Sequence, residues 1–296
     1  IPLTLDEIVD VLDGHPSRAL AHFVARGVST DSRTCSAGDV FIALRGARFD
    51  GHGYVDAALS RGAAAAIVDG APSPDGRPLI YVADTGAALK RLAAHHRGLS
   101  SASVIAVTGS NGKTTTKAMI HHVLSRRLKG RGAPASFNNA IGVPLTLLSV
   151  EHGDDYLVVE IGSSARGEVA SLAKMASPNV AVVTSIGEAH LAGFGDRSGV
   201  AAEKMSLLAH VRRGGLAVVN GDSEEIERIV KRGVGCNVVS FGVSGGADVR
   251  VGKVVTRVDS TRFTINDRFA VRLAVPGRHN ALNAAAAFAV CRRLAL

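Results

Sequence analysis

Residues 104–117 read Val-Ile-Ala-Val-Thr-Gly-Ser-Asn-Gly-Lys-Thr-Thr-Thr-Lys. A short apolar strand pattern leads into a turn with two glycines, and Lys113 and Thr114 open a helical stretch expected over 116–128. The order of strand, glycine turn and helix is typical of sites that hold a nucleotide phosphate, because backbone N–H groups and the helix N-terminus then face the anion. This stretch therefore predicts a phosphate site in an α/β domain.

The same loop supplies side chains for the phosphate and for a metal ion. Lys113 is placed to reach the outer phosphates, and the Thr114 hydroxyl is placed to hold Mg²⁺. The general P-loop pattern asks for glycine at position 107, where this chain has Val107. The flanking strand and helix still favour phosphate binding. The loop residues expected to contact the nucleotide are Gly109, Ser110, Asn111, Gly112, Lys113, Thr114 and Thr115.

Length and composition predict two globular domains. The chain has 296 residues, of which 46% are hydrophobic and 20% charged, so it can bury substantial cores. No apolar run approaches the ~20 residues that span a bilayer, and the first residues do not form a signal-peptide pattern. We therefore expect a cytoplasmic protein without a membrane span. The three cysteines lack C-x-x-C spacing and predict free thiols.

The basic net charge leaves two kinds of anionic partner open. The chain has 34 basic and 26 acidic residues, for a net charge of +8. Such a charge suits either nucleic acid or polyanionic small molecules. Only 4% of the residues are aromatic and none is tryptophan, which disfavours the stacking platforms that bind single strands. We expect nucleotide ligands and no nucleic acid.

Apolar periodicity divides the chain into residues 1–98 and 104–296. In the first domain strands are expected at 40–44, 63–68 and 79–82, and helices at 5–12 (with Thr4 as N-cap), 54–61 and 86–96. In the second domain strands are expected at 104–108, 157–161, 180–185, 216–220 and 237–240. These strands alternate with helical stretches, which favours a mainly parallel, doubly wound sheet.

The end of the chain follows a different pattern. Residues 248–275 alternate with period two and predict an antiparallel β addition to the parallel sheet. Residues 281–294 are alanine-rich and predict a helix that runs to the last residue without a stop signal. We therefore expect that a further C-terminal domain is absent from this chain. The histidine pairs at 95–96 and 121–122 lie in helical stretches and are expected on the surface.

Four positions outside the loop carry candidate chemistry. Glu160 ends a predicted strand beside the phosphate loop, where a carboxylate is well placed for Mg²⁺. His190 follows the strand at 180–185, and Lys204 lies fourteen residues later. A backbone-bonded loop histidine and an exposed helix lysine are the ordinary interpretations of these two. Asn138 suits either a turn or an amide that orients phosphate or carboxylate oxygens.

The motif His279-Asn280-x-x-Asn283 precedes the last predicted helix. Its asparagines suit a helix cap. They equally suit contacts with the base or ribose of a nucleotide.

Together these motifs resemble those of the Mur ligases, the ATP-dependent amide-forming enzymes of peptidoglycan synthesis. The resembling segments are Thr108–Lys117, Glu160–Gly162, Glu188–Leu191 with Phe194-Gly195, Lys204 and His279–Asn283. In the first domain, Asp31-Ser-Arg33, Gly38–Gly46 and Asp50-Gly-His52 resemble the uridine-nucleotide domain of the members that add the third or fifth peptide residue.

The resemblance implies both an architecture and a reaction. Residues 1–98 would form a small α/β uridine-nucleotide domain, and residues 104–296 a P-loop-type ATP-binding domain. In the family, a peptide carboxylate attacks the γ-phosphate of ATP and becomes an acyl phosphate, which an amine then converts to an amide. The segment Asn138–Pro144 is similar to that of the members that add D-alanyl-D-alanine. The implied substrates are then UDP-N-acetylmuramoyl-tripeptide and D-alanyl-D-alanine, and the expected state is a monomer.

Two other functions stay open. The chain could belong to a ligase that adds the third peptide residue, diaminopimelate or lysine. It could also be a nucleotide-binding fragment that is inactive without its third domain.

The resemblance also implies roles at the ATP site. Thr114 and Glu160 would hold one Mg²⁺, and His190 and Lys204 a second. Because an ammonium cannot ligate a metal, Lys204 would react with CO₂ to form an anionic carbamate, which requires that it lose its proton. Lys113 would hold the β- and γ-phosphates. The implied catalytic residues are Lys113, Asn138, His190 and Lys204.

The remaining implied roles concern the two nucleosides. Asn280 and Asn283 would contact the adenosine. Uridine diphosphate would meet side chains of the first domain, namely Ser32, Arg33, Arg45 and Arg48.

Overall fold

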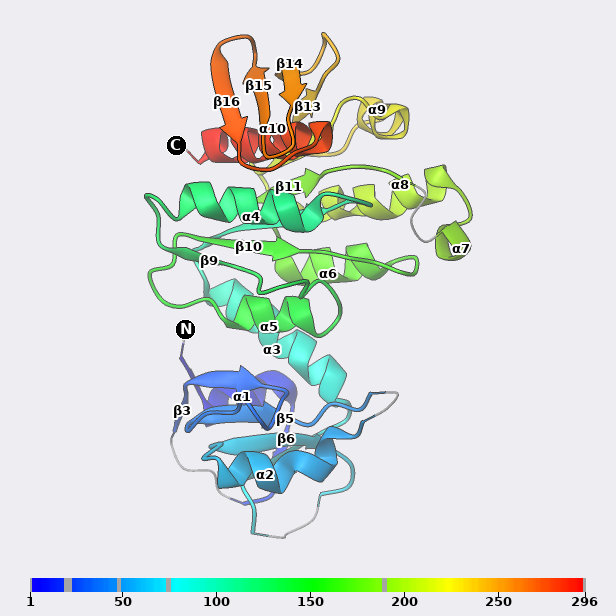
Figure 1. Ribbon diagram of the computed structural model, residues 1–296. Helices are drawn as coiled ribbons and strands as arrows, with labels where there is room; N and C mark the ends of the chain where they lie inside the picture. The colour runs from blue at the N-terminus through cyan, green and yellow to red at the C-terminus, as the bar shows by residue number, and fades with distance from the viewer. Residues whose placement is uncertain (1, 19–22, 47–48, 73–75, 188–190, 295–296) are drawn as a thin grey trace. The chain divides into compact units, whose positions relative to one another are not determined.

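The computed structural model describes residues 2–18, 23–46, 49–72, 76–187 and 191–294 (Figure 1). The chain forms two compact units, Ile1–Ser100 with Pro144–His152, and Ser101–Val143 with Gly153–Leu296. Residues 144–152 belong to the first unit because Leu145 and Leu148 of helix α5 (Gly142–Leu148) pack against its core.

The first unit is built on a five-stranded sheet of order β2-β7-β6-β5-β4, with β1 and β3 forming a separate pair. Strands β4 to β7 run parallel to one another, and β2 is antiparallel to β7. The elements are β1 (Leu3–Thr4), α1 (Leu5–Leu12), β2 (His15–Pro16), β3 (Val24–Ala25), β4 (Gly27–Ser29), β5 (Asp39–Ile42), the 3-10 helix Gly51–Tyr54, α2 (Val55–Ser60), β6 (Ala65–Asp69), β7 (Leu79–Val82) and α3 (Thr85–Leu99).

Alternate residues of the central strands of this sheet serve two cores. Val40 and Ile42 pack with α1 and α3, whereas Phe41 packs with α2. Both faces are therefore covered, which is why these strands are apolar at consecutive positions. The predicted cap of α1 is confirmed: the Glu7 N–H donates to the Thr4 hydroxyl over 3.1 Å, and the Thr4 N–H donates to the Glu7 carboxylate over 2.7 Å.

The second unit is built on a nine-stranded sheet of order β16-β15-β14-β13-β12-β11-β8-β10-β9. Its elements are β8 (Ser103–Thr108), α4 (Lys113–Leu124), β9 (Gly130–Gly132), β10 (Tyr156–Glu160), α6 (Glu168–Ala176), β11 (Val180–Val183), α7 (Leu191–Phe194), α8 (Arg197–Met205), the 3-10 helix Ser206–His210, β12 (Leu216–Asn220), α9 (Glu224–Lys231), β13 (Asn237–Gly242), β14 (Val249–Thr256), β15 (Thr261–Ile265), β16 (Phe269–Leu273) and α10 (Arg278–Arg293).

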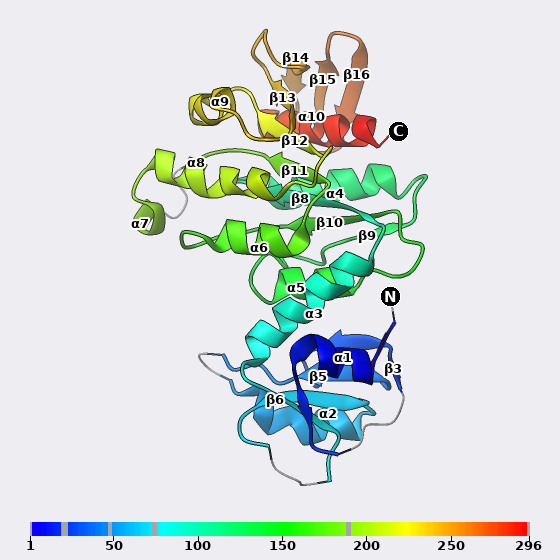
Figure 2. The same ribbon diagram turned by 180° about the vertical axis from the view of Figure 1, so that it is seen from behind.

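The predicted mainly parallel sheet with an antiparallel addition is confirmed. Strands β8 to β14 are parallel in the sheet, and β15 and β16 extend it antiparallel. Helices α4 and α10 pack on one face, through a core that includes Ile120 and Ala285. Figure 2 shows α6 and α8 in front of the opposite face. Helix α4 begins at Lys113 and ends at Leu124, four residues before the predicted end.

The strand order explains where a ligand can bind. β8 lies between β10 and β11, although the chain visits β9 and β10 before it crosses to β11. Such a reversal opens a crevice at the carboxyl ends of parallel strands. The register sets Glu160 beside Val107, and Val183 beside Thr108. The glycine loop after β8 is thereby flanked by the ends of β10 and β11.

The prediction that the paired histidines lie on the surface is wrong for His96, and His121 is half-buried. His96 is buried in α3. The Nδ1 atom of His121 lies 2.8 Å from the hydroxyl oxygen of Tyr156, and burial lowers the pKa of His121. None of the described helices combines the length and the apolarity needed to cross a bilayer.

Candidate active site

The loop between β8 and α4 needs glycine at two positions. Gly109 and Gly112 have φ of +146° and +82°, in the region that L-residues rarely adopt. A Cβ atom on Gly109 would lie 2.1 Å from the hydroxyl oxygen of Thr184, and one on Gly112 would lie 2.4 Å from Oδ1 of Asn283. The loop is thus a backbone cradle that a side chain would fill, which fits the close approach of a phosphate.

The segment after β11 holds the cradle in place. The Asn111 N–H donates to the Ser185 hydroxyl over 2.9 Å, and the Thr184 hydroxyl lies 2.6 Å from the Asn111 carbonyl, to which it donates. The Gly187 N–H donates to the Ser110 hydroxyl over 2.9 Å. Thr184 and Ser185 were not singled out from the sequence. The signal for them is their position directly after a strand adjacent to β8.

Lys113 folds back over the loop. Its ammonium donates to the carbonyls of Gly109 at 2.8 Å and Ser110 at 3.3 Å. Burial lowers the pKa of Lys113, and the nearby Glu160 carboxylate acts in the opposite direction. The predicted phosphate ligand is therefore already at the cradle.

The Glu160 carboxylate accepts hydrogen bonds from two residues with predicted roles, Thr114 at the metal and Asn138 at the substrate. Its side chain is 1% exposed. Oε2 accepts a hydrogen bond from the Thr114 hydroxyl at 2.9 Å, and Oε1 accepts one from the Asn138 amide at 2.9 Å. Mg²⁺ typically binds one or two protein oxygens together with substrate phosphates. A hydroxyl and a carboxylate beside a phosphate cradle fit that ion.

Lys204 lies in α8 and is only 3% exposed. The exposed-lysine interpretation is therefore wrong. Its ammonium donates to the Ser163 hydroxyl at 2.7 Å and lies 5.7 Å from the centre of the Phe194 ring. Burial, followed by the charge of Lys113, lowers the pKa of Lys204 to about 8. His190, predicted to act with Lys204, lies outside the described residues.

The pKa of Lys204 predicts a pH-dependent stability. Between pH 8 and its ordinary value of 10.5, the unfolded chain holds a proton on Lys204 that the folded protein has released. The free energy of unfolding therefore rises with pH across this window. We expect the Lys204→Met variant to lack this contribution. Urea unfolding of both proteins, without bicarbonate or metal, checks it, and curves that stay parallel across the window would contradict it.

Asn280 and Asn283 both lie in the first turns of α10, less than 10% exposed. The Asn283 amide donates to Oδ1 of Asn280 at 3.3 Å, and the Asn280 amide donates to the Pro276 carbonyl at 2.7 Å. Gly277, not an asparagine, is the N-cap of the helix. The structure thus brings Asn283 against Gly112 of the cradle.

Exchanging Gly112 for alanine should lower folding stability more than the same exchange at Gly153. Gly153 has φ of +83°, almost the value of Gly112, but a Cβ there would meet no atom within 4 Å. Gly153→Ala should cost about 1 kcal/mol of folding stability. Gly112→Ala should cost about 1–3 kcal/mol more, because its Cβ overlaps Asn283. Urea unfolding measures both. An equal cost for the two variants would disprove the overlap, whereas adding Asn283→Ala should relieve it.

In the first unit, Arg33 is bound by its own neighbour. Its guanidinium donates to both carboxylate oxygens of Asp31, at 2.9 and 2.7 Å, and the pair of hydrogen bonds helps lower the pKa of Asp31 to about 2. Ser32, between them, is 8% exposed. Arg33 itself is exposed and available to an anion.

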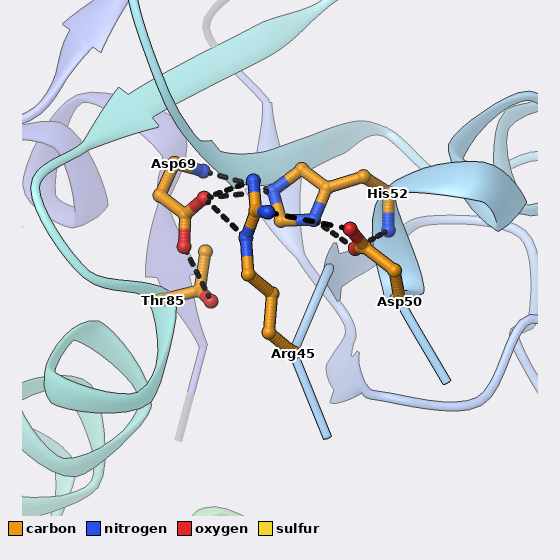
Figure 3. Close-up of polar contacts among 5 residues, drawn as sticks. All are labelled: Arg45, Asp50, His52, Asp69 and Thr85. Atoms are coloured by element: carbon orange, nitrogen blue, oxygen red, sulfur yellow. Dashed lines mark hydrogen bonds and ion pairs between the residues drawn. The ribbon is translucent and has the colours of Figure 1, made fainter. Parts of the chain in front are cut away.

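Arg45 lies in a polar network that three segments of the first unit build (Figure 3). Its guanidinium is 2.8 Å from Asp69 and 3.4 Å from Asp50. The His52 ring lies between the two aspartates: its Nε2 accepts from the backbone N–H of Asp69 at 3.1 Å, and its Nδ1 lies 2.6 Å from the Asp50 carboxylate. Two carboxylates therefore offset the charge of Arg45 before any ligand arrives. Arg48 lies outside the described residues.

Known proteins share both units. Residues 107–291 match the Mur ligase middle domain, and residues 24–97 match the catalytic domain of the Mur ligase family. A UDP-N-acetylmuramoyl-tripeptide–D-alanyl-D-alanine ligase of Bacillus subtilis is 38% identical over 272 residues, covering 90% of this chain and 58% of the relative. The ligase of the same name from Escherichia coli is 34% identical, covering 98% of this chain and 64% of the relative.

Solved structures of proteins with the same kind of name are also similar to this chain. MurF from Acinetobacter baumannii superposes with a TM-score of 0.92 at 32% identity, over 100% of this chain and 66% of that one. The MurF ligase of Thermotoga maritima in complex with ADP has a TM-score of 0.82 at 33% identity, over 92% of this chain and 64% of that one. This chain spans about three fifths of the length of the curated relatives. Since the middle-domain match alone covers more than half of its residues, the chain belongs to the Mur ligase family.

Proposed function

We propose that the full-length protein joins D-alanyl-D-alanine to UDP-N-acetylmuramoyl-tripeptide at the expense of ATP. The observation that carries this proposal is the Glu160 carboxylate, which binds Thr114 of the phosphate cradle and Asn138 at once. A phosphate site and a side chain able to orient a substrate are thereby joined at one carboxylate. The names of the relatives, which cover both units, support the choice of substrates.

At the nucleotide, the reaction requires positioning and charge stabilisation. Thr114 and Glu160 would hold one Mg²⁺, which when bound neutralises charge on phosphoryl oxygens. Lys113 would exchange its two carbonyl partners for the outer phosphates, and the N–H groups of Gly109–Thr115 would surround them. Asn280 and Asn283 would contact the adenosine, and the position of Asn283 against the cradle supports this.

We propose that Lys204 acts as a carbamate. The ammonium would first lose one proton, and its neutral amine would then attack CO₂ to form a C–N bond and release a second proton, so that a cation becomes an anion. A pKa of about 8 leaves a useful neutral fraction near neutral pH, about a tenth at pH 7, where an ordinary lysine has almost none. The anion would then share a second Mg²⁺ with His190.

In the proposed reaction, a carboxylate of the tripeptide would attack the γ-phosphorus of ATP, with ADP as leaving group. The D-alanyl-D-alanine amine would then attack the acyl carbon, releasing phosphate and a proton. Asn138 would orient the acyl phosphate. Residues 1–98 would bind uridine diphosphate through Ser32, Arg33, Arg45 and Arg48. We also propose a cytoplasmic monomer.

The test is the amine dependence of phosphate release in the full-length protein. With ATP and UDP-N-acetylmuramoyl-tripeptide, release should require D-alanyl-D-alanine, and diaminopimelate or lysine should not replace it. Release with diaminopimelate or lysine on the dipeptide acceptor, and none with D-alanyl-D-alanine, would reassign the protein to the third-residue step. The 296-residue chain alone should bind nucleotide but turn over poorly, because its relatives are longer; efficient ligation by it would disprove that part.

A further inference from the structure

Lys117 is a buried cation for which the proposed reaction has no use. It lies in α4 one turn beyond Lys113 and is only 5% exposed. Residues four apart share one face of a helix. Lys117 therefore lies on the same side of α4 as the cradle lysine, but within the protein. A buried ammonium is costly unless it is paired.

Lys117 contacts Glu160 of the candidate site and Ala135, which lies three residues before Asn138. Its Nζ atom lies 3.4 Å from Oε2 of Glu160, the same oxygen that accepts from Thr114. It also donates a hydrogen bond to the carbonyl of Ala135. Ala135 has φ of +41°, a left-handed value that is unfavourable for a residue with a Cβ atom. A conformation of this kind persists only where surrounding contacts impose it.

The segment 133–139, here called the Asn138 loop, is held at other points by β10 and by the residues that follow it. At one end, the Ala133 N–H donates to the Val158 carbonyl at 2.8 Å. At the other, the Gly162 N–H donates to the Asn138 carbonyl at 2.8 Å, and the Asn138 amide reaches Glu160. Between these two ends, Lys117 holds the loop at Ala135, the residue with the unfavourable φ.

We propose that Lys117 is a positioning residue that joins Glu160 and the Asn138 loop into one preformed unit. Its charge balances the buried carboxylate when no metal is present, which keeps Oε1 and Oε2 in place. Its hydrogen bond to Ala135 fixes the turn that aims the Asn138 amide. The role in catalysis rests on the function proposed above, but the ordering of the loop does not.

Hydrogen exchange in the metal-free, nucleotide-free full-length protein tests the loop directly. In Lys117→Met, peptides that cover residues 134–139 should exchange about tenfold faster or more, while peptides of β8 keep their protection. Lys174→Met, at an exposed position of α6, is the matched control. Exchange of the loop within about threefold of wild type would overturn the proposal. This readout needs no substrate, so it stands even if the proposed function fails.

A second variant covers the case in which Lys117→Met does not fold because Glu160 is left unpaired. Lys117→Met combined with Glu160→Gln removes both charges together. Its loop should still exchange about tenfold faster than that of Glu160→Gln alone, since the contact with Ala135 is missing. Equal exchange would overturn the proposal.

A double-mutant cycle separates positioning from general destabilisation. Lys117→Met should lower kcat about tenfold or more in the wild-type background. In an Asn138→Ala background the same change should cost clearly less, because one of the two side chains that Lys117 positions is gone. An equal loss in both backgrounds would show that Lys117 does not act through Asn138 and would overturn the proposal.

Discussion

Replacing Lys204 with alanine is expected to lower turnover of the full-length protein by about 1,000-fold or more. Lys204 is 3% exposed, bound to Ser163, and depressed in pKa to about 8. If it acts as a carbamate, its loss removes a negative ligand from the proposed site. Phosphate release dependent on D-alanyl-D-alanine measures the effect, and Lys174→Ala serves as the exposed-lysine control.

Two further observations make this prediction specific. Added bicarbonate should not restore the Lys204→Ala variant, because the attacking amine is gone. Wild-type protein equilibrated with ¹³C-bicarbonate should show a carbamate carbon signal that the variant lacks. Turnover of Lys204→Ala close to that of the wild type would exclude the carbamate role.

Replacing Lys113 with methionine should have an effect of similar size. Its ammonium lies at the cradle, 2.8 Å from the Gly109 carbonyl, and the proposal moves it onto the outer phosphates. Loss of that charge removes stabilisation that grows as charge develops on the phosphoryl oxygens, so turnover should fall by about 1,000-fold. Urea unfolding establishes that the variant is folded.

Comparing the affinities for ATP and AMP tests whether Lys113 contacts the outer phosphates. Affinity for ATP, which carries the outer phosphates, should weaken much more in Lys113→Met than affinity for AMP. An equal loss for both nucleotides would place Lys113 away from the β- and γ-phosphates.

Local patterns predicted the features that depend on neighbouring residues. The apolar runs predicted the central parallel strands of both sheets, because these strands are buried on both faces. The short strands β2, β4 and β9 lack such a run and were not predicted. The glycine loop and Glu160 were predicted together, since the carboxyl ends of adjacent parallel strands meet at one edge. The capping box of α1 follows from Thr4 and Glu7 alone. Such features need no knowledge of distant contacts.

Features that depend on distant contacts were beyond the sequence patterns. Nothing near Lys204 signals its burial, so only the family resemblance pointed to it. Arg45 contacts two carboxylates, one of them Asp69, 24 residues away. That these carboxylates offset its charge could be seen only in the folded structure. Lys117 could have been noted from its helical spacing to Lys113, but its contact with Ala135 could not.

Transfer of oxygen from the acceptor peptide to phosphate tests the central claim most directly. UDP-N-acetylmuramoyl-tripeptide labelled with ¹⁸O in the reacting carboxylate is incubated with the full-length protein, ATP and D-alanyl-D-alanine. Attack of that carboxylate on the γ-phosphorus predicts one ¹⁸O atom in phosphate for each amide formed, with ADP as the other product. Phosphate free of ¹⁸O, or AMP and pyrophosphate in place of ADP and phosphate, would contradict the account.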